Sequence, residues 1–214
     1  NKEGQNGSQL KTQSLTSMAI DTFLDESYWD ERWQNGQTGW DIGHASTPLT
    51  AYFDQLEYKE MRILIPGCGN AYEAEYLYDN GFKNVFVVDM SSTALTKFSD
   101  RCPSFPKDHL IQSDYFDLDE EFDLIVEQTF FCALEPNFRK DYVKKTHELL
   151  ASDGILMGVL FDKDFGKPTP PFGGTMEEYL GLFQSHFLIN TLEPCRNSIK
   201  PRMGSELFIK MEKS

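Results

Sequence analysis

Two glycines and an aspartate stand where a nucleotide-type cofactor would be bound. The segment I-L-I-P-G-C-G-N-A (63–71) places Gly67 and Gly69 after an apolar run, and a second apolar run ends at Asp89, twenty residues after Gly69. Glycines in such a turn let a ligand approach the backbone, and an acid at the end of the next strand suits a pair of ribose hydroxyls. The spacing predicts an adenosine-type cofactor.

Two further residues bear on which adenosine cofactor this would be. A dinucleotide site needs a small residue three positions after the second glycine, but that position here is Tyr72. Glu73 places negative charge at an expected helix start, where a phosphate would be repelled and an ammonium group attracted. S-adenosylmethionine has an ammonium group and no phosphate, so the residues favour it. The alternative that the glycine turn is structural and binds no ligand stays open.

The three tryptophans of the chain, Trp29, Trp33 and Trp40, fall within twelve residues of one another. Trp29 and Trp33 are four residues apart in an expected helix, so they share one face. Indole rings attract sulfonium and ammonium groups. The residues alone leave two interpretations open: aromatic anchors that pack a helix on the core, or a lid over a cationic ligand.

Cysteines and histidines give no evidence of metal chemistry. Zinc-ligand spacing and histidine neighbours are lacking around the four cysteines, which are Cys68, Cys102, Cys132 and Cys195. We expect free thiols and no bound metal. His44 and His147 have no acid at motif spacing and are expected to be structural or exposed.

These residues must be positioned by an alternation of strands and helices. Apolar runs predict strands at 62–66, 84–88, 110–116, 122–131, 155–161, 187–192 and 206–211. Helical patterns occupy part of 25–40 and also 49–57, 71–80, 91–98 and 138–150. The alternation predicts an α/β fold with a mostly parallel, doubly wound sheet and helices on both faces. The last two strands have no helix between them and predict an antiparallel hairpin at the sheet edge.

Four polar or glycine positions fall at the carboxyl ends of different strands: Gly67, Asp89, Asp114 and Gln128. Ligands of open α/β sheets bind beyond those ends. Four separate segments are therefore predicted to converge on one crevice.

Length and charge limit the class of protein. A chain of 214 residues can form one α/β domain, predicted here over 18–214, preceded by a polar, disordered tail at 1–17. The net charge of −14 opposes binding to nucleic acid or anionic membranes. No apolar run approaches the roughly 20 residues that span a bilayer. We expect a cytoplasmic monomer that acts on a small molecule.

Several motifs in order resemble the thiopurine S-methyltransferase superfamily of class I methyltransferases. They are W-x-x-x-W, W-D-I-G with P-L, I-P-G-C-G, V-V-D-x-S-x-x-A-L, S-D-Y-F, F-D-L-I and F-F-C-A-L-E-P. The closest resemblance is to the plant-type thiol and halide methyltransferase branch, and it covers roughly residues 27–210. It implies a Rossmann-like seven-stranded fold and S-adenosylmethionine as cofactor, with S-adenosylhomocysteine as product.

The resemblance also implies site residues near the methionine part of the cofactor. It assigns Trp29, Trp33 and Trp40 to a lid within about 25–45, which favours the second interpretation of the tryptophans. Gly67 and Gly69 would lie against the methionine part.

Further residues would contact the nucleoside part and the acceptor. Asp89 would bind the ribose hydroxyls, while Asp114 and Tyr115 would flank the adenine. Gln128 would lie near the transferred methyl, in contact with both cofactor and acceptor, where relatives carry Tyr or Arg. Phe161, where plant relatives carry Tyr, would line the acceptor pocket.

The implied reaction is in-line transfer of a methyl group from S-adenosylmethionine to a small soft nucleophile: a thiol, hydrosulfide, halide or thiocyanate. A thiol with a pKa near 8.5 is partly ionised at neutral pH, so no dedicated base is needed. Four phenylalanines could form a dry wall, although buried phenylalanines are more often plain core residues: Phe130, Phe131, Phe161 and Phe172. The alternatives are an NAD-dependent oxidoreductase and a non-catalytic protein that binds S-adenosylmethionine.

Overall fold

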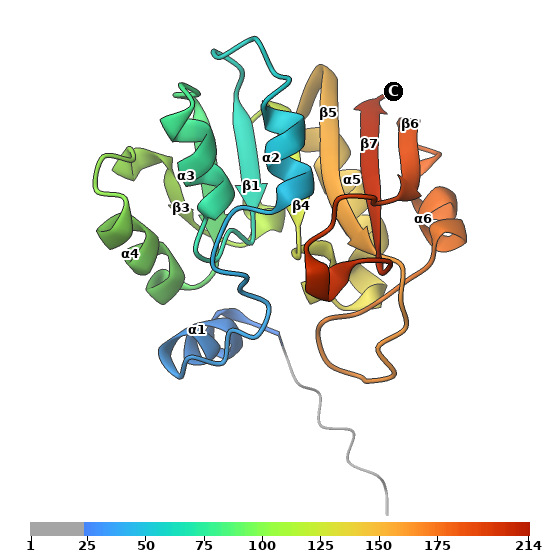
Figure 1. Ribbon diagram of the computed structural model, residues 1–214, viewed down its shortest axis with the longest axis horizontal. Helices are drawn as coiled ribbons and strands as arrows, with labels where there is room; N and C mark the ends of the chain where they lie inside the picture. Colours follow the sequence, from blue (N-terminus) through green and yellow to red (C-terminus); the bar gives the residue numbers. More distant parts are fainter. Residues whose placement is uncertain (1–23) are drawn as a thin grey trace, which may run out of the picture.

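A seven-stranded sheet forms the centre of the structure, a computed structural model that describes residues 24–214. The order across the sheet is β3-β2-β1-β4-β5-β7-β6, and β7 runs antiparallel to its neighbours β5 and β6 while the other pairs are parallel (Figure 1). The strands are β1 (Ile63–Pro66), β2 (Val85–Asp89), β3 (Leu110–Gln112), β4 (Phe122–Gln128), β5 (Leu150–Phe161), β6 (Phe187–Pro194) and β7 (Glu206–Lys213). The predicted parallel sheet with a C-terminal antiparallel hairpin is confirmed.

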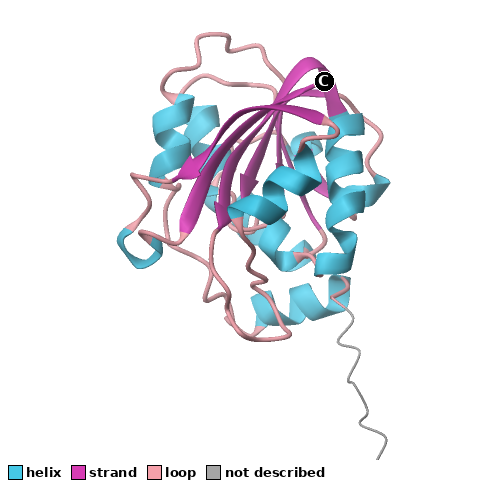
Figure 2. Cartoon of the chain, turned by 90° about the vertical axis from the view of Figure 1, so that its right-hand side faces the viewer, coloured by secondary structure: helices cyan, strands magenta, loops and turns pink. Residues whose placement is uncertain are grey.

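Helices cover both faces of the sheet (Figure 2), because successive side chains of each strand point to opposite sides. In β1, Ile63 and Ile65 belong to one core cluster with side chains of α2, α3 and α4, whereas Leu64 belongs to a second cluster with α5 and α6. The helices are α1 (Glu26–Gln34), α2 (Thr47–Phe53), α3 (Tyr72–Asp79), α4 (Ser92–Arg101), α5 (Arg139–Leu149) and α6 (Met176–Phe183).

Several element boundaries differ from the sequence prediction, and one helix was not predicted. Strand β4 ends at Gln128 rather than 131. Strand β3 ends at Gln112 rather than 116, because Asp114 accepts the N–H of Phe116 and starts a 3₁₀ turn, η2 (Tyr115–Asp117). Strand β5 begins at Leu150, five residues before the predicted start at 155. The sequence reading missed α6, which Thr175 caps by accepting the N–H of Glu178.

The tail that the sequence predicts to be disordered, residues 1–17, lies outside the described residues. Within residues 24–214, no helix is long and apolar enough to cross a membrane.

Helix α1 lies across the carboxyl ends of the parallel strands (Figure 1). Residues of α1 and of these strand ends line one cavity.

Candidate active site

A cavity of about 740 Å³ lies at the carboxyl ends of the parallel strands, under α1. This volume is in the range of sites that bury a drug-sized ligand. All ten residues predicted for the site line it: Trp29, Trp33, Trp40, Gly67, Gly69, Asp89, Asp114, Tyr115, Gln128 and Phe161. The predicted convergence of distant segments is therefore present in the structure, while the binding roles of these residues stay predictions.

The glycine turn after β1 is tied to the end of β2. Gly67 and Gly69 have φ values of +56° and +52°, in the left-handed region that favours glycine. The N–H of Gly69 donates to Oδ2 of Asp89 at 2.9 Å, and the N–H of Ser91 donates to Oδ1 at 2.9 Å. Each carboxylate oxygen keeps a further lone pair that could accept from a ligand hydroxyl. Burial raises the pKa of Asp89 above its ordinary value.

Aromatic rings cover both glycines of this turn. A methyl group on Gly67 would collide with the ring of Phe130, and one on Gly69 would lie 2.9 Å from Cζ2 of Trp33. The absence of side chains at these positions therefore also allows the rings that line the cavity to pack closely.

The tryptophans both pack and line the cavity. Trp33 is 4% exposed, and Trp29 and Trp40 are half-buried. The ring of Trp40 lies edge-to-face with both others, at centroid distances of 5.8 Å to Trp29 and 5.9 Å to Trp33. Anchoring of the helix and a role as a lid are thus compatible, because Trp33 is buried against the core while all three tryptophans line the cavity.

Helix α1 is fastened to α4 at two points. Oδ1 of Asp30 accepts from Oγ of Ser91 at 2.7 Å and from the N–H of Thr93 at 2.9 Å, at the start of α4. The hydrogen bond from the N–H of Thr93 is the main cause that lowers the pKa of Asp30. Nζ of Lys97 donates to the carbonyl of Trp33 at 2.9 Å. Since Ser91 also donates to Asp89, the lid helix is linked to the end of β2.

The segment predicted to flank an adenine has one side chain free and one committed. Oδ1 of Asp114 accepts the N–H of Phe116 at 3.0 Å, which leaves its second oxygen for a ligand amine. Tyr115 is 3% exposed, its ring stacks on that of Tyr142, and its hydroxyl pairs with Oγ1 of Thr146 at 2.8 Å. Tyr115 therefore supports the cavity from the core, with its hydroxyl already paired.

An arginine that was not predicted for the site lies on the cavity wall beside Phe161. Arg202, in η5 (Lys200–Arg202), is 9% exposed and lines the cavity. Its Nη2 donates to the carbonyl of Trp40 at 2.8 Å, its Nη1 lies 3.6 Å from Oε1 of Glu206, and its Cζ lies 5.6 Å from the ring centroid of Phe161. The only sequence signal was a basic residue just before the last strand of an acidic chain.

Two polar atoms on this wall have unused hydrogen-bonding capacity. Among the described residues, Oε1 of Gln128 and Nη1 of Arg202 are buried and have no hydrogen-bond partner. Buried polar groups are normally hydrogen-bonded, so each unsatisfied one calls for an explanation such as a ligand. An anionic ligand would accept from Nη1 of Arg202, whereas Oε1 of Gln128 needs a ligand group that donates.

The predicted dry wall is only partly correct. Phe130 and Phe161 line the cavity, but Phe131 is 1% exposed in the core against Tyr142. Phe172 lies outside the cavity lining, with its N–H donating to the carbonyl of Cys132. The core interpretation that the sequence left open holds for Phe131, and Phe172 does not belong to the wall; apolar type alone does not say whether a side chain faces core or cavity.

A second missed residue, Glu127, shapes the turn that follows β4. It is 1% exposed and accepts from the N–H groups of Phe130 and Phe131 at 2.9 and 2.8 Å and from the hydroxyl of Tyr142 at 2.7 Å. Thr129, inside this turn, has a φ of +59°, which is uncommon for a residue with a side chain. Burial raises the pKa of Glu127 to about 7. Glu127 thus holds the backbone that presents Gln128 and Phe130.

Burial disfavours the thiolate form of the cysteines in the cavity. All four cysteines are free, as predicted, and Cys68 and Cys132 line the cavity. Burial raises the pKa of Cys68 well above its ordinary value and that of Cys132 to about 12. A raised pKa opposes a nucleophilic role, because the thiolate is the nucleophile. Within residues 24–214, no group of three or more His, Cys, Asp or Glu side chains could hold a metal ion.

Comparison with known sequences gives a consistent result. The family model described as thiopurine S-methyltransferase matches residues 24–209. Thiocyanate methyltransferase 1 of Brassica oleracea is 30% identical over 210 residues, covering 94% of this chain and 91% of the relative. Probable thiol methyltransferase 2 of Arabidopsis thaliana is 28% identical over 197 residues, covering 87% and 84%. Thiopurine S-methyltransferase of Acinetobacter baylyi is 26% identical over 194 residues, covering 79% and 88%.

Solved structures share the fold at low sequence identity. The 1,6-didemethyltoxoflavin-N1-methyltransferase of Burkholderia thailandensis, crystallised with S-adenosylhomocysteine, has a TM-score of 0.72 at 18% identity and covers 88% of this chain and 87% of its own. The magnesium protoporphyrin IX methyltransferase of Synechocystis, also crystallised with S-adenosylhomocysteine, has a TM-score of 0.69 at 11% identity and covers 89% and 100%.

Proposed function

The chain belongs to the thiopurine S-methyltransferase family and is an S-adenosylmethionine-dependent methyltransferase of small nucleophiles, and we propose that its acceptor is a soft anion. The resemblance predicted from the motifs is thereby confirmed, as is the class I methyltransferase fold. An NAD-dependent oxidoreductase is not favoured by these findings.

The residues of the cavity fit S-adenosylmethionine. Asp89 keeps acceptor capacity for two ribose hydroxyls, and the second oxygen of Asp114 is available for an exocyclic amine. Glu73, at the start of α3 beside the glycine turn, is 6% exposed and lines the cavity, where it would attract an ammonium group. The bound cofactor supplies an electrophilic methyl group on a sulfonium.

The observation that carries the proposed acceptor class is the buried guanidinium of Arg202 beside Phe161, in the cavity that Gln128 also lines. A buried cation stabilises an anion more strongly than water-exposed cations do, because the surroundings screen it less. Glu206, 3.6 Å from Nη1, balances part of this charge, so an anionic acceptor would be bound through the N–H group of Arg202 that has no hydrogen-bond partner. The names of the relatives, which include thiocyanate and thiol methyltransferases, agree with this class.

The residues of the acceptor wall have three tasks in this reaction. Arg202 holds the acceptor as an anion, so charge stabilisation replaces proton removal. Phe130 and Phe161 keep water away from it, which leaves a soft anion more reactive. The turn held by Glu127 fixes Gln128, and alignment of the two reacting atoms at roughly 3 to 3.5 Å accounts for much of the rate.

A methyl-transfer assay tests this proposal. Protein and S-adenosylmethionine carrying an isotopically labelled methyl group are incubated with thiocyanate, hydrosulfide, iodide, an aryl thiol and, as the uncharged comparison, imidazole. Labelled methyl products are identified by mass spectrometry. We expect methylated anions, with the imidazole product lower by at least tenfold. Binding of S-adenosylmethionine without methylation of any anion would refute the proposed acceptor and support the non-catalytic alternative.

We further expect several properties that accompany this function. They are the monomeric state, the cytoplasmic location, the lack of a nucleic-acid partner, and the assignment of individual residues to the ribose, adenine, methionine and acceptor positions.

A further inference from the structure

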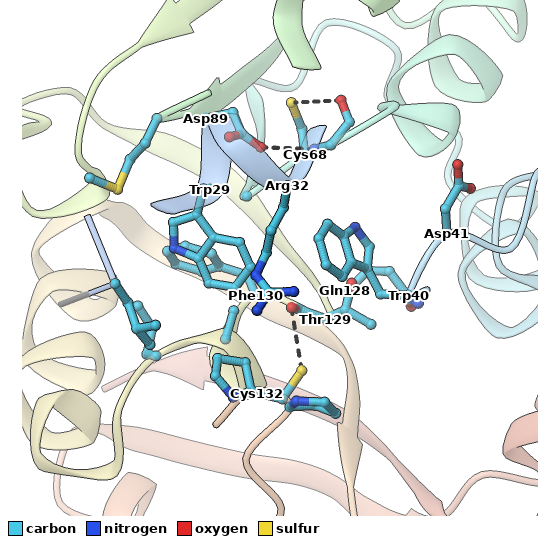
Figure 3. Close-up of a pocket in the computed structure, with 18 of the residues that line it drawn as sticks. Trp29, Arg32, Trp40, Asp41, Cys68, Asp89, Gln128, Thr129, Phe130 and Cys132 are labelled. Carbon is cyan, nitrogen blue, oxygen red and sulfur yellow. Dashed lines mark hydrogen bonds between the residues drawn. The ribbon is translucent and has the colours of Figure 1, made fainter. Parts of the chain in front are cut away.

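Helix α1 carries a positively charged side chain into the cavity. Figure 3 shows Arg32 reaching from α1 between the indoles of Trp29 and Trp40 toward Phe130. Its Cζ lies 4.5 Å from the ring centroid of Tyr28, one turn earlier in the helix. Within residues 24–214 its guanidinium makes no ion pair or hydrogen bond. Arg32 is half-buried, so this charge is held partly away from solvent.

The cavity that Arg32 lines contains several carboxylates, besides Lys163, Lys167 and Arg202. The cavity lining includes Asp25, Asp41, Glu73, Asp89 and Asp114. The methionine end of S-adenosylmethionine is a zwitterion, with an ammonium group and a carboxylate on one carbon. The acids provide partners for the ammonium group, but they repel the carboxylate. A site that binds this end tightly therefore needs a cation close to the glycine turn.

Two arginines line the cavity, and their positions separate their roles. Arg202 is fixed to the carbonyl of Trp40, faces Glu206 and lies over Phe161 on the acceptor wall. Arg32 instead precedes Trp33, whose ring covers Gly69 in the turn predicted to face the methionine part. Arg32 thus belongs to the helix that covers the glycine turn, whereas Arg202 belongs to the wall with Phe161.

We propose that Arg32 binds the carboxylate of the cofactor and so couples the lid helix to the bound amino-acid end. This inference rests on the proposed cofactor geometry. Arginine suits the role because its planar fork of N–H donors matches a carboxylate. The fastening of α1 through Asp30 and Lys97 holds the backbone of the lid in place. Arg32 can then reach the ligand without a large rearrangement of α1.

The test compares two ligands that differ only in the amino-acid end. S-adenosylhomocysteine has the carboxylate and the ammonium group, whereas 5′-methylthioadenosine lacks both. Dissociation constants for each are measured by calorimetry at low salt, on the wild type, Arg32→Gln and Arg32→Lys. Arg196→Gln serves as the matched control, because Arg196 is exposed, lies outside the cavity lining and changes the net charge equally.

We expect Arg32→Gln to weaken S-adenosylhomocysteine about ten- to hundredfold, the range for a lost charge-assisted hydrogen bond. The affinity for 5′-methylthioadenosine should change less than about twofold, because that ligand has no carboxylate with which Arg32 could interact. Arg32→Lys should recover part of the loss, and Arg196→Gln should match the wild type.

Two results would overturn the inference. An equal loss for both ligands would mean that Arg32 only supports the lid, and unchanged affinity for S-adenosylhomocysteine would mean that it makes no contact with the cofactor. Failure of the wild type to bind S-adenosylhomocysteine would instead refute the proposed cofactor site. The wild-type titration and the variant comparison thus separate the two claims.

Discussion

The two halves of the cavity are assembled from chain segments of very different separation. The proposed cofactor half, Gly67, Gly69, Asp89 and Asp114, comes from the ends of β1, β2 and β3, which are adjacent in the sheet. The proposed acceptor half, Gln128, Phe161 and Arg202, joins β4 and β5 to the segment before β7. Its hydrogen bond from Arg202 to Trp40 spans 162 positions.

This difference separates local from tertiary determinants of a site. The cofactor half follows from strand-turn-helix units in which backbone and side chains within about 20 residues bind one another. The acceptor half instead needs the segment between β6 and β7, which carries Arg202, to pack against β5 and Trp40. The cofactor half is accordingly the part that relatives with other acceptors would share, and the acceptor half is where a change of substrate would arise.

The largest expected effect concerns the carboxylate beneath the acceptor half. Burial raises the pKa of Glu127 from an ordinary value of 4.5 to about 7. The protonated form therefore stabilises the fold; this contribution is complete below about pH 4.5 and is lost as the pH rises through about 7. It amounts to about 3 kcal/mol in the free energy of unfolding.

Urea unfolding of the wild type and Glu127→Gln at pH 5 and pH 8 measures this contribution. The amide can still accept from the N–H groups of Phe130 and Phe131 but cannot ionise. The wild type should lose more stability than the variant between the two pH values. Parallel pH profiles would show that Glu127 keeps an ordinary pKa.

Next in size is a substitution in the cofactor half. Asp89→Ala removes the acceptor of the Gly69 and Ser91 N–H groups and of the expected ribose hydroxyls. Binding of S-adenosylhomocysteine should weaken by about 1.5 to 3 kcal/mol, the scale of hydrogen bonds to a charged group. Calorimetric titration gives the value, and equal affinity in variant and wild type would remove Asp89 from the cofactor site.

A substitution in the acceptor half should act on the other substrate. Arg202→Gln should raise the KM for thiocyanate about tenfold, because one charge-assisted contact of roughly 1.4 kcal/mol is lost. The dissociation constant of S-adenosylhomocysteine should change less than twofold. Steady-state kinetics and calorimetry are run together, with Arg202→Lys as the variant that keeps the charge. A larger effect on cofactor binding than on KM would break the division into two halves.

The smallest effect is expected at the apolar part of the acceptor half. Phe161→Tyr adds a hydroxyl beside the guanidinium of Arg202, where it can donate to an anionic acceptor. The KM for thiocyanate should fall about threefold, as expected for a neutral hydrogen bond of roughly 0.5 to 1 kcal/mol. Initial rates at saturating cofactor measure this, and a raised KM would indicate that the hydroxyl crowds the pocket instead.

The sheet and the cofactor half could be predicted from the sequence because their determinants are close in the chain. Apolar runs located all seven strands, and the spacing from Gly69 to Asp89 brought the turn and the acid together. The resemblance placed the tryptophans at the cavity, where all three are found. The limits of some strands differed from the prediction. The cap at Asp114 follows the end of β3 at Gln112, and β5 begins at Leu150, five residues before the predicted start.

The rest of the site depends on information that is absent from local patterns. Arg32 and Arg202 lie on surfaces whose meeting only tertiary packing determines. Phe130 and Phe131 are neighbours of identical type, yet one lines the cavity and the other packs in the core. The three hydrogen bonds to Glu127 fix this difference through a turn that contains Thr129 at positive φ.

The most direct test of a methyltransferase with separate cofactor and acceptor halves is one matrix of initial rates. Methyl transfer to thiocyanate is measured for the wild type, Asp89→Ala and Arg202→Gln while both substrate concentrations are varied. We expect excess S-adenosylmethionine to restore the rate of Asp89→Ala, and excess thiocyanate to restore that of Arg202→Gln. Absence of methyl transfer by the wild type, or rescue of each variant by the opposite substrate, would contradict the account.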